Sequence, residues 1–150
     1  MDIKTGTQDE VRDIAQFQVD MALESEGTVL DINTLIPGVS AAVADPQKGI
    51  YLVAVEGAET VGSLLLTKEW SDWNNSFYWW IQSVYVKPEH RRKGVYRALY
   101  DRAKDMARRD GATQIRLYVD KTNLRGQQTY QALGMHESHY LMYEEELASR

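Results

Sequence analysis

A basic, glycine-bearing segment, HRRKGVYR at residues 90–97, offers the clearest chemistry in this sequence. Gly94 separates a run of cationic side chains from an apolar helical pattern, as expected of a turn that opens a helix. The first backbone N–H groups of a helix have no partner within it, and the helix dipole favours negative charge there. Arg91, Arg92 and Lys93 add positive charge that a phosphate can use. The segment predicts an anion site; the alternative is a solvated run of charge at a helix start.

The elements on either side of this turn are predicted to form a crossover unit. Aromatic and β-branched residues at 77–86 indicate a strand, and Pro88 marks its exit. A helix is expected from Gly94 or Val95 to Asp110, with Gly111 at the position that follows a helix end. A strand at 114–119 completes a right-handed parallel crossover. The turn then lies at the carboxyl end of the first strand, where open α/β sheets tend to bind ligands.

The remaining periodicity predicts the other elements. Further strands are expected at 2–7, 50–56, 61–67, 135–139 and 141–145, and further helices at 8–24, from about 31 or 34 to 44, and at 124–133, with a polar loop at 69–76. Thr7 and Glu10 form a capping box at the first helix. The fold class is α/β (α+β mixed), a single domain over residues 1–150 with a mixed sheet of about six to seven strands and about four helices.

Composition excludes some classes of chemistry. The chain has no cysteine, so neither disulfides nor thiolate catalysis can occur. No run approaches the length of a membrane span, and the acidic N-terminus does not resemble a secretory signal, so a cytoplasmic protein without a membrane partner is expected. Residues 1–75 carry 4 basic and 13 acidic side chains, a net charge of −9, whereas residues 76–150 carry 13 and 9, a net charge of +4. The acidic half suits a cationic ligand and the basic half a polyanionic one.

Two motifs together carry a family resemblance. Residues 84–96 read VYVKPEHRRKGVY, and residues 123–135 read NLRGQQTYQALGM. In this combination and element order the chain resembles the GNAT superfamily of N-acetyltransferases, nearest its diamine and polyamine branch. The resemblance implies an enzyme that moves an acetyl group from acetyl-CoA to a primary amine by direct transfer, without a metal. A homodimer is compatible with it.

The resemblance also implies where acetyl-CoA binds. The cofactor of the family lies where two central strands splay apart, here 77–86 and 114–119. The backbone of Val84, Tyr85 and Val86 is then expected to pair with the pantetheine arm, like an added strand. The pyrophosphate is expected on the turn and the first helical amides, which comprise Arg91, Arg92, Lys93, Gly94, Val95, Tyr96 and Arg97. Tyr96 departs from the small residue of the family pattern, so its ring must point away from the phosphates.

The second motif implies the catalytic acid. Tyr130 matches the family tyrosine that protonates the leaving CoA thiolate, and it also contributes to the cofactor site; an ordinary packing role is the alternative. Asn123 matches a pantetheine contact, and it is equally suited to cap the helix that follows.

Fewer residues indicate where the amine acceptor binds. The branch often carries Glu-Asp on the fourth strand, where this chain has Gln82 and Ser83. Water relayed by these residues, or a carboxylate from Glu26, Glu69 or Asp72, could act as the base. Trp80 belongs to a tryptophan-rich stretch that could provide an aromatic wall for a small cationic amine, the expected acceptor, or could simply pack the core.

Other functions remain open at this stage. Loss of the strand carboxylates and the presence of Tyr96 would suit a catalytically weak CoA-binding sensor. An amino acid or a protein amine is the rival acceptor. A nucleic-acid binder using the basic residues from Arg91 to Arg109 is disfavoured by the acidic total charge. His90, His136 and His139 lack a metal-binding spacing, so no metal is expected.

Overall fold

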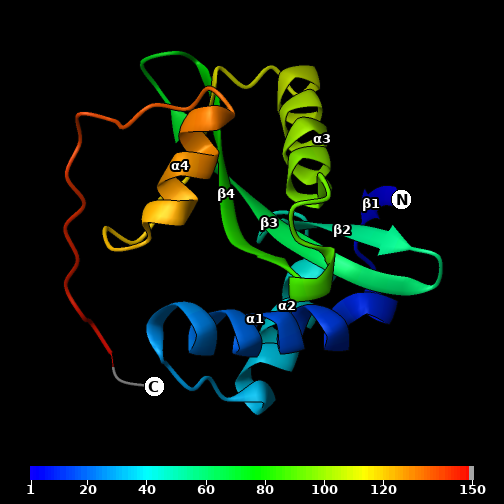
Figure 1. Cartoon of the computed structure of the whole chain (residues 1–150). Helices are drawn as coiled ribbons and strands as arrows, with labels where there is room; N and C mark the ends of the chain where they lie inside the picture. The colour runs from blue at the N-terminus through cyan, green and yellow to red at the C-terminus, as the bar shows by residue number, and fades with distance from the viewer. Residues whose placement is uncertain (149–150) are drawn as a thin grey trace. The chain divides into compact units, whose positions relative to one another are not determined.

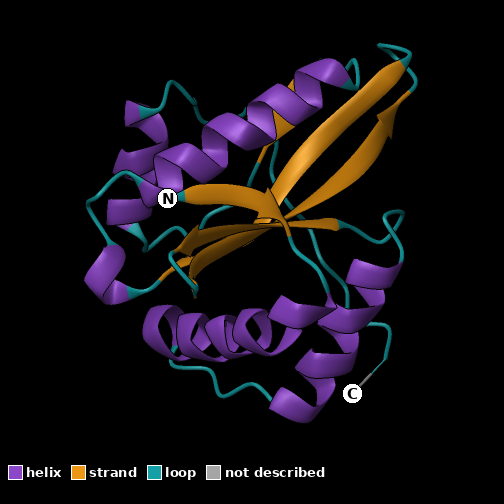
Figure 2. Ribbon diagram, turned by 90° about the vertical axis from the view of Figure 1, so that its right-hand side faces the viewer, coloured by secondary structure: helices purple, strands orange, loops and turns teal. Residues whose placement is uncertain are grey.

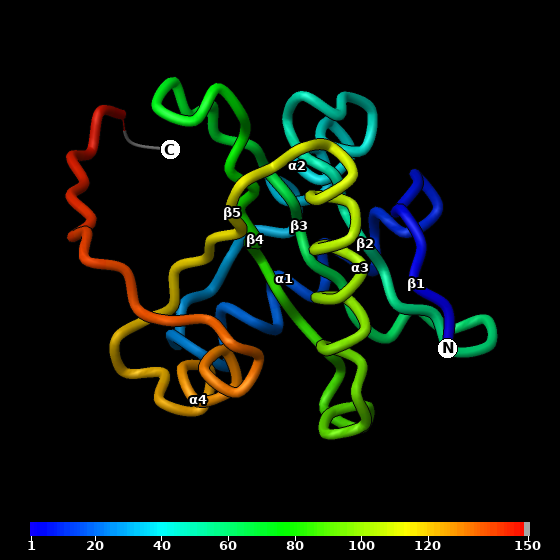
Figure 3. The backbone as a smooth tube through the Cα atoms, turned by 90° about the horizontal axis from the view of Figure 1, so that it is seen from above, coloured from blue at the N-terminus to red at the C-terminus, as the bar shows by residue number. Residues whose placement is uncertain are grey.

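Five strands form one sheet in the order β1-β2-β3-β4-β5, as Figure 3 shows from above. The computed structural model describes residues 1–148. The strands are β1 (Asp2–Thr5), β2 (Ile50–Glu56), β3 (Glu59–Ser71), β4 (Ser76–Val86) and β5 (Gln114–Arg116). The first four strands pair antiparallel, and β5 pairs parallel with β4. The parallel pair is the expected crossover, because the α3 helix (Val95–Arg109) links its two strands.

Helices cover both faces of this sheet (Figure 1; strands are orange in Figure 2). One face carries α1 (Val11–Glu26) and α2 (Ile32–Ala44), and the other carries α3. Ile14 and Val39 from the helices pack against Tyr51 and Val53 of β2 in one buried cluster. Because side chains alternate along a strand, Leu52 and Ala54 of the same strand point to the α3 side, where Leu99 is fully buried.

The helix starts follow from local chemistry. Thr7 and Glu10 form the expected capping box, so a short 3-10 turn, η1 (Gln8–Glu10), leads into α1. Asp31 caps α2 by accepting a hydrogen bond from the Asn33 amide at 2.9 Å. Pro37 lies inside α2 rather than interrupting it. Pro37 has no N–H, so one bond of the helical ladder is missing there.

The β3–β4 hairpin is longer than the sequence predicts. The loop expected at 69–76 is wrong, because Glu69, Trp70 and Ser71 extend β3 and Ser76 begins β4. Trp70 stands opposite Phe77, and their rings meet edge to face at 5.0 Å. Such cross-strand aromatic pairs stabilise the ladder beyond the point where residue propensity alone would end it.

The chain divides into two compact units, Met1–Tyr118 and Val119–Arg150. The second contains α4 (Leu124–Ala132), which is followed by Leu133 and by Gly134 with a left-handed backbone. The strands expected at 135–139 and 141–145 are wrong: neither range forms a strand. The sheet of the described residues therefore has five strands rather than six or seven. A strand needs a neighbour for its backbone groups, and a pattern of residues cannot supply one.

No helix within residues 1–148 is long and apolar enough to cross a membrane.

Candidate active site

The basic turn adopts a conformation suited to binding an anion. A 3-10 turn, η2 (Pro88–His90), leads into it, and Arg92 and Gly94 both have left-handed backbones, with φ of 62° and 82°. Gly94 caps α3, and the first bond of the helix runs from the Ala98 amide to the Gly94 carbonyl at 3.0 Å. The amides of Val95 to Arg97 therefore precede the helical ladder. A side-chain carbon on Gly94 would meet nothing within 4 Å, so the turn is open at this residue. Unpaired amides at a helix start favour an anion.

Gly62 explains how this turn can lie so close to the sheet. A side-chain carbon at Gly62 would stand 3.0 Å from the Tyr85 carbonyl oxygen and 3.3 Å from a methyl carbon of Val95. Only a glycine leaves room there for the first residue of α3. Val95 is buried, whereas Arg92, Lys93 and Arg97 are exposed. The packing thus fixes the helix start and leaves three cations of the turn at the surface.

Arg91 has a different role from the other cations. Its guanidinium donates to both carboxylate oxygens of Glu24, at 2.7 and 2.8 Å, and its Nε donates to the Val86 carbonyl at 2.8 Å. The hydrogen bond from Arg91 holds the pKa of the Glu24 carboxyl below its usual value. Arg91 therefore ties the end of β4 to α1, and its predicted phosphate contact remains a prediction.

The expected splay of the central strands is present. β5 pairs with β4 only from Tyr78 to Trp80, and β4 continues to Val86. Within the described residues, the β5-side edge of 81–86 has no strand partner. This open edge includes Val84, Tyr85 and Val86, whose backbone was predicted to pair with pantetheine. The Val86 carbonyl already accepts from Arg91, so a second donor there would share that oxygen.

A β-bulge bends β4 beside this open edge. Between the pairs Leu65↔Gln82 and Ser63↔Tyr85, Ser83 and Val84 oppose one residue of β3. Ser83 has a left-handed backbone with φ of 54°. Bulges re-aim side chains and end pairing, and they are common next to active sites. After the bulge Tyr85 is buried against Phe17 of α1, at 5.4 Å between ring centroids.

Tyr96 lies on the flank of α3. It is half-buried, and its ring packs edge to face against Tyr100 at 6.2 Å, one helical turn further along. Its backbone amide remains in the first turn of the helix, where it can donate to an anion.

The second unit positions Asn123 and Tyr130 on α4. Asn123 caps this helix, because its Oδ1 accepts from the Gly126 amide at 2.9 Å. A side-chain carbon at Gly126 would come within 2.7 Å of the side-chain Nδ2 of Asn123, so a larger residue there would force the capping side chain to shift. Tyr130 is half-buried in the last part of α4, and its carbonyl accepts from Met135 at 3.0 Å. Its predicted role as an acid remains a prediction.

Two of the predicted acceptor-side residues lie together at the point where the strands part. Trp80 donates its indole N–H to Glu69 at 2.8 Å. Arg116, which sequence reasoning missed, lies 3.5 Å from the same carboxylate and stacks over Tyr78 at 4.0 Å. Trp80 and Tyr118 approach each other at 6.1 Å between ring centroids. The result is an aromatic surface that holds a carboxylate and a guanidinium side by side.

The remaining predicted acceptor-side residues have other contacts or lie at the surface. Gln82 donates to Thr67 at 2.8 Å, and the Ser83 carbonyl accepts from Gln18 at 3.4 Å. Asp72 is exposed in the β3–β4 turn, and Glu26 is the exposed last residue of α1.

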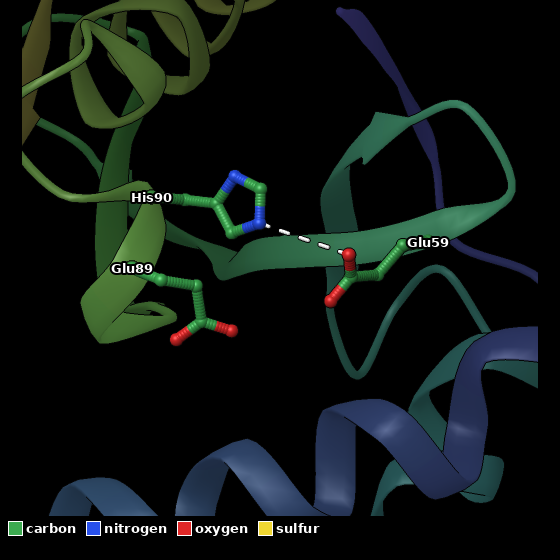
Figure 4. Close-up of side chains that lie close together, drawn as sticks. All are labelled: Glu59, Glu89 and His90. Atoms are coloured by element: carbon green, nitrogen blue, oxygen red, sulfur yellow. Dashed lines mark ion pairs between the residues drawn. The ribbon is translucent and has the colours of Figure 1, made fainter.

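His90 forms a cluster that its spacing did not indicate. Glu59, Glu89 and His90 each offer a ligand atom, and these atoms lie within 4.8 Å of one another (Figure 4). Both carboxylates are exposed, and Lys87 already forms an ion pair with Glu59 at 2.7 Å. The hydrogen bond from Lys87 lowers the pKa of the Glu59 carboxyl. These contacts fasten η2 to the start of β3, and the absence of a metal from the mechanism remains a prediction.

Comparison with known proteins decides the family. Residues 13–135 match the family described as Acetyltransferase (GNAT) family. The chain belongs to the GNAT acetyltransferase family. A solved structure described as a possible acetyltransferase from Clostridium difficile 630 is 39% identical, with a TM-score of 0.92 over 99% of this chain and 98% of that one.

Two further comparisons involve proteins described as acetyltransferases. A thialysine N-epsilon-acetyltransferase of Bos taurus is 29% identical over 100 residues, 67% of this chain and 53% of the relative. The chain thus spans about half the length of this curated relative. A predicted acetyltransferase from Clostridium acetobutylicum, solved with acetyl-CoA, has a TM-score of 0.78 over 96% of this chain and 95% of that one, at 14% identity. The diamine branch is not singled out by these comparisons.

Arg116 belongs to this aromatic surface, although no sequence pattern pointed to it. As a lone arginine in a predicted strand it carries no motif. The signal that could have found it is the parallel crossover, which places residue 116 beside the aromatic residues of β4. Its partner Glu69 was assigned to a loop, so the pair could not be anticipated.

Proposed function

We propose that this protein transfers the acetyl group of acetyl-CoA to a primary amine. The observation that carries the proposal is the open turn at Gly94, which presents left-handed backbone and the first amides of α3 directly after the unpaired edge of β4. Diphosphate fits such a helix start, and an amide-bearing arm fits such a strand edge. The residues present therefore suit CoA. A CoA thioester supplies an activated acetyl group.

The chain's own residues limit how transfer can proceed. The sequence has no cysteine, so a cysteine-linked acetyl intermediate is impossible. The proposed route is direct attack of the amine on the thioester carbonyl. The nitrogen–carbon bond forms, the carbon–sulfur bond breaks, and the thiolate that leaves must gain a proton. Tyr130 is the proposed donor of that proton, since a positioned phenol can act as a general acid. Water held near Gln82 and Ser83 is the proposed route for the proton that the amine loses.

The proposed acceptor is a small cationic amine. Glu69 supplies a carboxylate within an aromatic surface, and the indole of Trp80 offers a face for cation–π attraction. Arg116 favours a second candidate, an amine that also carries a carboxylate, because a guanidinium stacked on Tyr78 is preorganised for carboxylate binding. The Bos taurus relative, named for the ε-nitrogen of thialysine, is compatible with that candidate.

A panel of matched acceptors tests both candidates. Lysine and thialysine would be compared with cadaverine, which lacks the carboxylate, by following acetylated product and free CoA at low and high salt. If the acceptor is a small cationic amine without a carboxylate, cadaverine should be preferred over lysine and thialysine. The KM for cadaverine should then rise with salt, because screening lengths fall from about 10 Å at 0.1 M to about 3 Å at 1 M. A neutral or anionic acceptor with a salt-independent KM would contradict this assignment. Acetyl-CoA binding without transfer to any amine would instead indicate a sensor.

The variant Arg116→Gln tests whether the acceptor amine carries a carboxylate, because Arg116 is the residue proposed to bind it. If the acceptor's carboxylate is bound by Arg116, the variant raises the KM for lysine by roughly tenfold or more and leaves that for cadaverine unchanged. Arg109→Gln is the matched control, since Arg109 is an exposed arginine at the end of α3. Equal KM changes for both acceptors would show that Arg116 does not read a carboxylate.

A further inference from the structure

Two neighbouring residues of α1 contact the β-bulge of β4 from one face of the sheet. Gln18 is only 5% exposed, and its Nε2 donates to the Ser83 carbonyl at 3.4 Å. Phe17, the preceding residue, packs against the ring of Tyr85, two positions after Ser83. A buried side-chain amide needs a hydrogen-bond partner, because leaving it unpaired away from water is costly. The contact between Gln18 and Ser83 therefore belongs to the packed interior.

The backbone of Ser83 needs support of this kind. Its φ of 54° lies in the left-handed region, which residues other than glycine seldom occupy. Such a conformation persists only where the surrounding structure holds it. In a regular strand the carbonyl points toward a neighbouring strand, whereas the Ser83 carbonyl is bonded to a helix that covers one face of the sheet. The direction of this carbonyl is therefore set by α1 rather than by the strand ladder.

The same contact fixes the direction of an N–H group at the open edge of β4. In a trans peptide group the C=O and N–H bonds point in opposite directions. Since the Ser83 carbonyl points toward α1, the Val84 N–H of the same peptide group points away from it. Val84 belongs to the part of β4 whose β5-side edge has no strand partner within residues 1–148. An amide donor there can meet a carbonyl oxygen of a bound acetyl-CoA arm.

We propose that Gln18 is a positioning residue for acetyl transfer. By holding the Ser83 carbonyl against α1, it aims the Val84 N–H at the acetyl-CoA arm, an inference that rests on the proposed function. The thioester oxygen gains negative charge when the amine attacks, and a preorganised donor stabilises that charge more than it stabilises the bound substrate. Loss of the Gln18 contact should lower kcat by roughly tenfold or more and leave the dissociation constant of acetyl-CoA nearly unchanged.

Substitutions at Gln18 test this role through a pH profile. Gln18→Met keeps the length of the side chain and removes the donor, whereas Gln18→Glu removes the donor only while the new carboxyl group is ionised. Burial raises the pKa of a carboxyl group, and a protonated carboxyl can again donate to the Ser83 carbonyl. Relative to the natural protein at each pH, kcat of Gln18→Glu should therefore recover between about pH 8 and about pH 6. Gln18→Met should stay low throughout.

The control is Gln16→Glu, which adds the same charge at an exposed position of α1. Charged groups near the neighbouring Tyr85 include Glu24, Arg91, Asp20 and Glu89. They are the same in every variant, so they cannot produce a difference between the Gln18 variants. Natural kcat in Gln18→Met would overturn the proposal. So would a low kcat in both Gln18 variants without recovery at low pH, because a purely structural role predicts that result.

The carbonyl-carbon NMR signal of Ser83 provides a readout that needs no turnover. It should shift in Gln18→Met, and in Gln18→Glu it should return toward its natural position as the pH falls. An unshifted signal in Gln18→Met would overturn the proposal whatever the kinetics. If the natural protein binds acetyl-CoA and acetylates no amine, the proposed function fails, whereas the Ser83 signal still decides whether Gln18 holds the bulge.

Discussion

At the scale of single residues, Tyr130 carries the proposed proton transfer. Tyr130→Phe keeps the ring and removes the phenol, so turnover should fall by roughly 10²–10⁴ while acetyl-CoA affinity stays nearly constant. Steady-state kinetics together with direct titration of acetyl-CoA separate the two effects. Tyr143→Phe is the control, since that side chain is 89% exposed. Equal turnover in Tyr130→Phe and the natural protein would show that another group protonates the thiolate.

Glu24 and Arg91 give a prediction about acid stability. The folded-state pKa of Glu24 is lowered by its bond from Arg91, so the ionised carboxylate stabilises the fold above the unfolded pKa. This stabilisation is lost as the pH falls through the lowered folded value. Glu24→Gln should therefore lower Tm at pH 7, and the difference from the natural protein should shrink once the pH falls below the unfolded pKa of about 4.3 and vanish when the folded-state carboxyl is protonated.

The pair is partly exposed, with 36% of the Arg91 side chain and 48% of the Glu24 side chain accessible. Solvent screening should make the effect modest and reduce it further in high salt. Thermal unfolding across pH, at low and high salt, measures it. A difference in Tm that persists unchanged at pH 3 would contradict an origin in this ion pair.

At the scale of elements, the cap of α4 makes a prediction about Gly126. Gly126→Ala would place a carbon within 2.7 Å of the Asn123 side chain, so the cap must break or shift. Lost caps cost about 1 kcal/mol. Hydrogen exchange of the α4 amides should speed up accordingly. Gly38→Ala is the control, because a side-chain carbon there meets nothing within 4 Å. Unchanged protection in Gly126→Ala would show that Asn123 does not cap the helix in solution.

The same elements show how far the sequence could be interpreted. β2, α3 and α4 were predicted to within a residue or two, because apolar periodicity and capping residues are local signals. The part of the β3–β4 hairpin next to its turn was predicted as a loop, because cross-strand pairs such as Trp70–Phe77 stabilise the strands there. Arg116 and the Glu24–Arg91 pair were missed because their partners are distant in sequence. Residues 141–145 have a strand pattern, but no strand forms without a neighbouring edge.

At the scale of the whole molecule, the proposed cofactor residues and the proposed acid belong to different compact units. The unit Met1–Tyr118 holds the open turn and the unpaired edge of β4, and the unit Val119–Arg150 holds Tyr130. Binding and proton transfer should therefore be separable: changes at the turn affect acetyl-CoA affinity, and changes at Tyr130 affect turnover.

The most direct test of the account is acetyl-CoA binding at the open turn. Gly94→Glu adds a carboxylate where the phosphates would lie, and Gly111→Glu makes the same change at the other end of α3. Both glycines have left-handed backbones, with φ of 82° and 78°, and both have open space around them. The two variants should therefore suffer similar strain. At about 100 times the dissociation constant, acetyl-CoA should stabilise the natural protein and Gly111→Glu by roughly 2.7 kcal/mol and Gly94→Glu not at all. No stabilisation of the natural protein, or equal stabilisation of Gly94→Glu, would contradict the account.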